Sequence, residues 1–124
     1  MSIKTMLGTG PFLGLMATVS SISIGQLLFK TAAVRANSAH SLFAPNVLLA
    51  LGCALLMYAG ATLIWIWVLR SVPLTLAYAC ISLSFVIVPI LARIFLNEPL
   101  TARVAAGLML IICGILISIS GRPA

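Results

Sequence analysis

Residues 47–69 read VLLALGCALLMYAGATLIWIWVL, an apolar run without a single charged side chain. A helix needs about 20 such residues to cross the roughly 30 Å hydrocarbon core of a bilayer. Three further runs of the same character lie at about residues 11–33, 75–95 and 104–120. The sequence therefore predicts an all-α integral membrane protein with four transmembrane helices, forming a single domain over residues 1–124.

The overall composition indicates a protein whose solvent is lipid. Hydrophobic residues make up 63% of the chain and charged residues 6%, and the mean hydropathy is +1.29. A soluble domain is closer to half apolar and a quarter charged. The net charge of +6 comes from basic residues that are spread singly, mostly where apolar runs end. This spacing suits contact with membrane lipid headgroups, so we expect membrane lipids and not nucleic acid as partners.

Residues that commonly carry catalysis or bind metals are scarce. The chain has one acidic residue, Glu98, and one histidine, His40. Its three cysteines fall in three different apolar runs without metal-ligand spacing, and free cysteine behaves there as a small hydrophobe. We expect no enzymatic activity, no metal and no cofactor.

Short polar connections separate the four runs. The longest, residues 35–41, is followed by Pro45, which favours a helix start. Residues 70–73 and 97–101 are too short to leave room for a soluble domain. Glu98 precedes Pro99, so we expect it in the first turn of the fourth helix, where a carboxylate meets the positive helix end. A charge pair with Arg93 or Arg103 is the alternative.

The first helix carries two stripes at helical spacing. The small stripe predicts close helix packing, and it consists of Gly14, Thr18, Ser21 and Gly25. The polar stripe consists of Ser23, Gln26 and Lys30. The amide of Gln26 indicates either a lined cavity or an interhelical hydrogen bond, since a polar group within lipid needs a partner. Lys30 either snorkels to the surface or presents a cation to an anionic headgroup or phosphate.

The third helix places Tyr78, Ser82, Phe85 and Pro89 along one face. Pro89 removes a backbone hydrogen bond, so we expect a kink there. Tyr78 and Ser82 either line a substrate path or, for the tyrosine, form an interfacial anchor. Arg93 follows a turn later, near the membrane surface.

The fourth helix has a glycine stripe, which consists of Gly107, Ile111, Gly114, Ser118 and Gly121. Small residues stabilise contacts in lipid because they let backbones approach closely. The stripe predicts either a dimer contact or helix packing within one chain.

Four motifs in this order give the chain a resemblance to a known superfamily. They are GQLLFK at 25–30, VPLTLAY at 72–78, SLSFV at 82–86 and NEP at 97–99. Together they resemble the drug/metabolite transporter superfamily, which includes four-helix proteins of the small-multidrug-resistance type. Within it the chain is most similar to the small subunits of the aminoarabinose-phosphoundecaprenol flippase, over residues 21–120.

The small multidrug resistance family is the nearest alternative, and the chain departs from it at two positions. That family resembles this chain at Gly25, Lys30 and Tyr78, but it depends on a glutamate at the position of Ile22 and an aromatic residue at that of Ile81. A lipophilic cation leaving water needs a buried carboxylate as its partner. The resemblance therefore favours a lipid-linked sugar phosphate over a cationic drug.

The resemblance implies a flippase subunit that translocates an undecaprenyl-phosphate-linked sugar, 4-amino-4-deoxy-L-arabinose being the leading candidate. It implies a multi-pass location in a bacterial inner membrane and a role in lipid A modification and polymyxin resistance. Four helices are few for such a path, so we expect a homodimer or a heterodimer with a related small subunit. Two alternatives are a small-multidrug-type efflux transporter and a non-transporting assembly subunit. The groove candidates are Ser23, Gln26, Lys30, Tyr78, Ser82 and Arg93.

Overall fold

The computed structural model describes residues 8–121, and within them every regular element is a helix. The helices are α2 (Thr9–Ala39), α3 (Pro45–Leu69), α4 (Leu74–Ile81), α5 (Ser84–Leu96) and α6 (Ala102–Ser120). Since α4 and α5 together form the segment Leu74–Leu96, four segments are long and apolar enough to cross a membrane. The prediction of an all-α protein with four transmembrane segments is confirmed.

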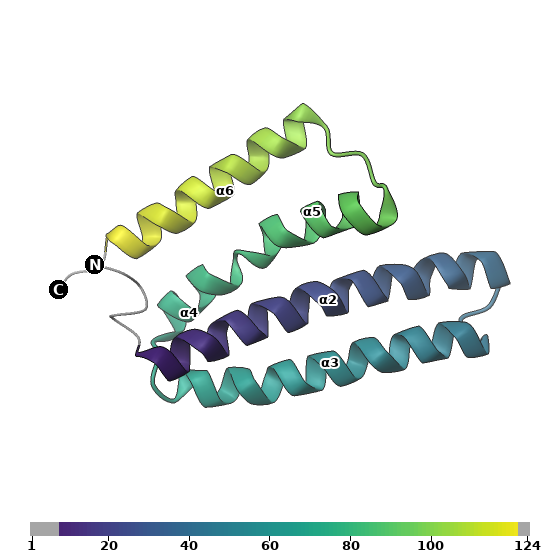
Figure 1. Ribbon diagram of the computed structural model, residues 1–124, viewed down its shortest axis with the longest axis horizontal. Helices are drawn as coiled ribbons and strands as arrows, with labels where there is room; N and C mark the ends of the chain where they lie inside the picture. The colour runs from purple at the N-terminus through teal and green to yellow at the C-terminus, as the bar shows by residue number, and fades with distance from the viewer. Residues whose placement is uncertain (1–7, 122–124) are drawn as a thin grey trace.

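The helices form an antiparallel arrangement in which α2 and α3 lie side by side along their whole length (Figure 1). One buried cluster joins α2 and α3 to α4 through Leu15, Val68 and Leu76. A second cluster of small residues, Ala32, Val47 and Ala50, joins the other ends of α2 and α3. Helix α6 lies on the far side of α5 from α2. The α2–α3 pair is therefore the packed centre of the chain, and α6 is peripheral.

Close contact between α2 and α3 depends on two glycines of the small stripe. A Cβ added at Gly14 would lie 2.5 Å from Val68 Cγ2, and one at Gly25 would lie 2.6 Å from Tyr58 Cε2. Both glycines are buried. Any side chain at these positions would force the α3 residues to move, so the absence of a Cβ sets how closely the helices approach.

Helix ends follow local sequence signals. Pro45 occupies the first turn of α3, where a missing N–H has no consequence. Asn97 closes α5 in the left-handed conformation with φ 54°, which asparagine tolerates better than most residues. The Thr101 side chain caps α6 by accepting a hydrogen bond from the N–H of Val104 at 3.4 Å.

The helix boundaries differ from expectation in two places. Helix α2 continues to Ala39, past the expected end near residue 33. The third span is interrupted at Ser82 and Leu83, whereas Pro89, the expected kink, lies inside α5. The hydroxyls of Ser82 and Ser84 donate to the carbonyls of Tyr78 and Ile81 at 2.8 Å each. The Tyr78 carbonyl keeps its bond from the Ser82 amide at 3.0 Å. At Ile81 the Ser84 hydroxyl stands in place of the Phe85 amide, which donates to the Ser82 carbonyl at 3.0 Å instead, so the regular helix pattern is lost there.

Candidate functional site: a groove along α2

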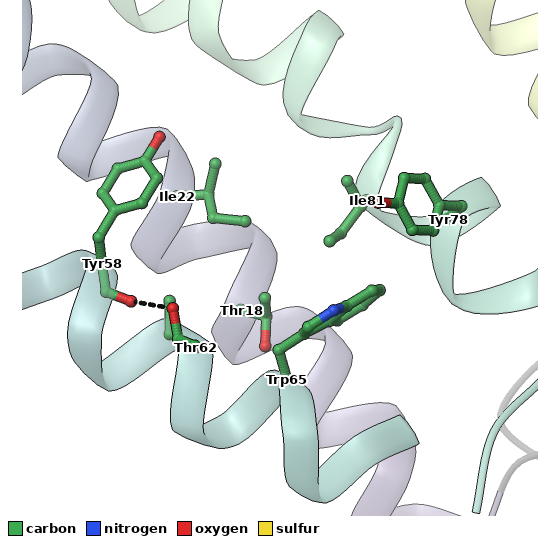
Figure 2. Close-up of a pocket in the computed structure, with 8 residues that line it drawn as sticks. Thr18, Ile22, Tyr58, Thr62, Trp65, Tyr78 and Ile81 are labelled. Atoms are coloured by element: carbon green, nitrogen blue, oxygen red, sulfur yellow. Dashed lines mark hydrogen bonds between the residues drawn. The ribbon is translucent and has the colours of Figure 1, made fainter. Parts of the chain in front are cut away.

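The first part of the site is a cavity of about 240 Å³ between α2, α3 and α4. Figure 2 shows Tyr58, Thr62 and Trp65 extending from α3, with Thr18 and Ile22 on α2 and Tyr78 and Ile81 on α4. Ala61 completes the wall. The Thr62 hydroxyl donates to the Tyr58 carbonyl at 2.8 Å, so its hydrogen bond is made within α3. The cavity wall is thus largely apolar and aromatic, and all its residues are uncharged.

Aromatic side chains hold the shape of this cavity. The rings of Trp65 and Tyr78 meet edge to face, with centroids 5.8 Å apart and an interplanar angle of 73°. Tyr58 packs in a tilted arrangement against Phe29, with centroids 5.3 Å apart. Edge-to-face pairs are favourable because a positive ring edge meets a negative ring face. The Trp65–Tyr78 pair therefore ties α3 to α4 across the cavity.

A second cavity, of about 450 Å³, continues along α2 towards α5. Its walls include Gln26, Ser84, Phe85 and Pro89, and it shares Ile22 and Ile81 with the first cavity. The Gln26 side chain donates from Nε2 to the Tyr58 hydroxyl. Of the two expectations for Gln26, a lined cavity and an interhelical hydrogen bond, the structure shows both. Ile22 and Ile81 form the boundary between the two cavities.

The charged residues gather beyond the second cavity, at the α5–α6 connection. Lys30 Nζ lies 3.0 Å from Glu98 Oε1, and the two side chains are 51% and 44% exposed. Arg93 Nη1 donates to the backbone carbonyl of Glu98 at 3.5 Å. We call Lys30, Arg93 and Glu98 the charged cluster.

The cavities and the charged cluster lie along one face of α2. Thr18, Ile22, Gln26 and Lys30 follow one another at intervals of four residues, which places them on one side of a helix. At 1.5 Å per residue this face extends about 18 Å from Thr18 to Lys30. We call the whole feature the α2 groove. It is apolar and aromatic at one end, carries an amide in the middle and is charged at the other end.

The structure places Glu98 differently from the first turn expected for it. Helix α6 begins at Ala102 with Thr101 as its cap, so Glu98 lies in the connecting loop. Its carboxylate pairs with Lys30 of α2, and the contact with Arg93 is made by its backbone. Thr101 already satisfies an amide of the first turn of α6, which leaves the carboxylate free to reach α2.

The six groove candidates divide into three groups. Lys30 and Arg93 belong to the charged cluster, and Gln26 and Tyr78 line the two cavities. Ser23 is buried, and its hydroxyl donates to the Val19 carbonyl at 2.7 Å. Ser82 lies at the interruption of the third span and bonds to Tyr78. Neither serine is among the residues that line the described cavities.

Helix α3 contributes three cavity residues that were not predicted from the sequence. Tyr58, Thr62 and Trp65 lie four and three residues apart, a spacing that puts them on one helix face. The polar atoms of these three side chains, all on one face, could have indicated a cavity wall. They were not singled out because residues 47–69 are otherwise uniformly apolar. Tyr58 matters most, because it contacts Gln26, Phe29 and the first cavity together.

The glycine stripe lies outside the groove, on the open surface of α6. Gly107, Gly114, Ser118 and Gly121 are exposed and Ile111 is half-buried. A Cβ added at Gly107 or Gly114 would meet no atom within 4 Å. Among residues 8–121, therefore, no helix packs against these two glycines. Helix α6 faces its own chain through Ile115 and Ile119 instead.

Four membrane-spanning segments, three of which line the cavities of the α2 groove, define a multi-pass membrane protein with the layout of a small transporter. The sequence profile of the EamA-like transporter family matches residues 3–120, and the chain belongs to that family.

Several curated relatives carry the same name, probable 4-amino-4-deoxy-L-arabinose-phosphoundecaprenol flippase subunit ArnE. The protein of Sodalis glossinidius is 44% identical over 66 residues, which cover 53% of this chain and 60% of the relative. That of Enterobacter is 37% identical over 67 residues, covering 54% and 63%. That of Salmonella newport is 33% identical over 103 residues, covering 83% and 92%. The chain thus spans about three fifths of the first two relatives and nearly all of the third. No solved structure matches the chain.

Proposed function

We propose that this chain is a subunit of a flippase that carries an undecaprenyl-phosphate-linked amino sugar across a bacterial inner membrane. The cargo is 4-amino-4-deoxy-L-arabinose-phosphoundecaprenol, and its delivery serves the modification of lipid A. The names of the relatives support this assignment. The chain acts as a transporter rather than an enzyme, together with a second copy or a related small subunit.

One observation carries the proposal: the α2 groove is uncharged along its centre and basic at one end. A polyprenyl tail stays in the hydrocarbon, while the sugar phosphate needs a path shielded from it. Aromatic and hydroxyl side chains, including Tyr58 and Tyr78, suit a sugar ring because they offer an apolar face with a polar tip. Lys30 and Arg93 supply cations for the phosphate.

The two cavities lack the carboxylate that efflux of a cationic drug would need. A cationic drug leaving water requires a carboxylate in the cavity wall, and Ile22 lies there instead. The acidic residue of the charged cluster, Glu98, is in the α5–α6 loop and is paired with Lys30.

The decisive experiment is complementation of a strain that lacks this protein. We expect the wild type to restore aminoarabinose on lipid A, measured by mass spectrometry, and resistance to polymyxin. Lys30→Glu should abolish both while membrane expression stays normal, because a carboxylate there repels the phosphate. Arg103→Gln, which removes an exposed charge in the first turn of α6, serves as the control. Full function in both Lys30→Ala and Lys30→Glu would rule out Lys30 as the phosphate contact and favour a non-transporting assembly subunit.

A further inference from the structure

The charged cluster contains one carboxylate, that of Glu98, as well as the cations of Lys30 and Arg93. A site that binds only phosphate does not need a carboxylate. Lys30 Nζ and Glu98 Oε1 lie 3.0 Å apart, so the carboxylate partly neutralises the cation that the phosphate would bind. An acidic residue beside a phosphate site lowers its affinity through like-charge repulsion. Glu98 therefore needs an explanation beyond phosphate binding.

The chemistry of the proposed cargo explains the presence of a carboxylate in this cluster. The headgroup named for the relatives has a 4-amino group on the sugar and a phosphate linkage. The amine is protonated near neutral pH, as aliphatic amines are, so the headgroup is a zwitterion. Its two charges lie on opposite corners of one sugar ring, at the amino-bearing carbon and the anomeric carbon. They cannot pair closely with each other, and each needs a partner when it leaves water.

We propose that Glu98 is the acceptor for the cargo's ammonium group, and that the Lys30–Glu98 ion pair opens to receive the zwitterionic headgroup. This inference rests on the proposed function. In the bound state Lys30 and Arg93 hold the phosphate, Glu98 holds the ammonium, and the sugar ring lies between them. In the free state the two protein charges pair with each other.

The geometry of the pair fits such an exchange. The side chains are 51% and 44% exposed, and an ion pair this open to water contributes little to stability. Glu98 lies in the loop between α5 and α6, and its N–H donates to the Ala92 carbonyl of α5 at 3.3 Å. Its side chain can rotate away from α2 while this backbone hydrogen bond is kept. Arg93 contacts the Glu98 backbone, which keeps a second cation beside the loop when the pair opens.

The position at the end of the α2 groove fits as well. The residues that line the two cavities are uncharged, so the groove centre holds no carboxylate to pair with an ammonium ion. Among residues 8–121, Glu98 is the one acidic side chain. Recognition of the amine, as opposed to the sugar ring, must therefore fall to this residue.

The test measures binding of two lipids to the full-length protein in phosphatidylcholine nanodiscs. The first is 4-amino-4-deoxy-L-arabinose-phosphoundecaprenol, and the second is its N-acetyl derivative, which keeps the phosphate but has no positive charge. We expect the wild type to bind the amino lipid about tenfold or more tightly than the N-acetyl lipid, as for loss of one charged hydrogen bond. Glu98→Gln should reduce this preference to below about twofold, whereas the control Arg103→Gln should keep it.

The outcomes separate this inference from the proposed function. Equal binding of both lipids by the wild type overturns the role of Glu98 and leaves the flippase assignment standing. A preference that persists in Glu98→Gln overturns it as well. If the wild type binds neither lipid, the proposed function fails and takes the inference with it. The wild-type comparison needs no variant, so poor folding of Glu98→Gln does not prevent a decision.

A bulk lipid with the same charges must be distinguished from the cargo. Phosphatidylethanolamine also combines an ammonium and a phosphate, so it is added to the nanodiscs in a separate series. We expect it to change the affinity for the amino lipid less than about twofold. A larger loss in the wild type that disappears in Glu98→Gln would assign the site to the bulk headgroup and overturn its assignment to the cargo.

Discussion

Ile22 is the residue that most clearly separates this chain from a proton-coupled drug transporter. Its side chain lies in the wall of both cavities, at the boundary between them. A carboxylate at such a position, with apolar walls on every side, would have a strong preference for a cationic partner. With isoleucine there, the middle of the α2 groove has no carboxylate that could exchange a proton for a cation.

Introducing a carboxylate at position 22 should therefore not increase transport of the lipid-linked sugar. We predict that Ile22→Glu lowers or leaves unchanged the aminoarabinose content of lipid A in the complemented strain, because a carboxylate repels the phosphate of the cargo. We also predict that the purified wild type releases no protons when tetraphenylphosphonium is added, measured with a pH indicator in weakly buffered detergent. Proton release by the wild type would contradict the assignment to an anionic lipid.

At the scale of single residues, the sequence predicted which polar side chains lie along the groove better than it predicted the residues that they contact. Lys30, Gln26 and Tyr78 were identified because each is polar within an apolar run. Their contacts with Glu98, Tyr58 and Trp65 could not be inferred, since they join elements far apart in the chain. Periodicity indicates the face on which a side chain lies, but not the helix that packs against that face.

At the scale of the helices, the α2–α3 pair depends on the absence of a side chain at Gly25. The Tyr58 ring packs over this glycine and lies tilted against Phe29, and its hydroxyl accepts a hydrogen bond from Gln26. One close backbone approach thus supports both the helix packing and the wall of the first cavity.

A single methyl group at this position tests that dependence. We predict that Gly25→Ala destabilises the protein by about 1–3 kcal/mol, the range for overpacking a well-packed core, because the added Cβ would lie 2.6 Å from Tyr58. Gly60→Ala on α3 is the matched control, since a Cβ there would meet nothing within 4 Å. Denaturation in mixed detergent micelles, followed by circular dichroism, measures both variants. Equal stability of the two would show that Tyr58 moves aside freely.

The third span illustrates where helix prediction from sequence fails. A kink is expected at Pro89, which lies within α5, but the interruption of the helix at Ser82 and Leu83 was not predicted. Proline removes one amide, whereas the Ser84 hydroxyl occupies the Ile81 carbonyl and the Phe85 amide bonds to Ser82 instead. The sequence contains both signals, and nothing in it ranks one above the other.

At the scale of the whole molecule, the chain is a packed helix pair with a loosely attached periphery. Helix α6 has a single buried side chain, Ile115, within the described residues. Its glycine stripe faces open space, next to the side that meets α4 and α5. Of the two expectations for this stripe, packing within one chain receives no support at Gly107 and Gly114. A contact of this stripe with a second chain stays a prediction.

The open space beside Gly114 allows association between chains to be tested separately from folding. We predict that Gly114→Leu weakens association with a second copy or a related subunit by about tenfold or more, or about 1.4 kcal/mol, because a leucine keeps the partner's backbone away. Ala105→Leu, also exposed but on the opposite face of α6, should leave association unchanged. Crosslinking in membranes between cysteines placed along both faces measures the two variants. Since no atom lies within 4 Å of a Cβ at position 114, the leucine has room within its own chain, and monomer stability should stay the same. If Gly114→Leu lowers the stability of the monomer and leaves crosslinking unchanged, the glycine stripe packs within one chain. If it abolishes crosslinking at constant stability, the partner binds at α6.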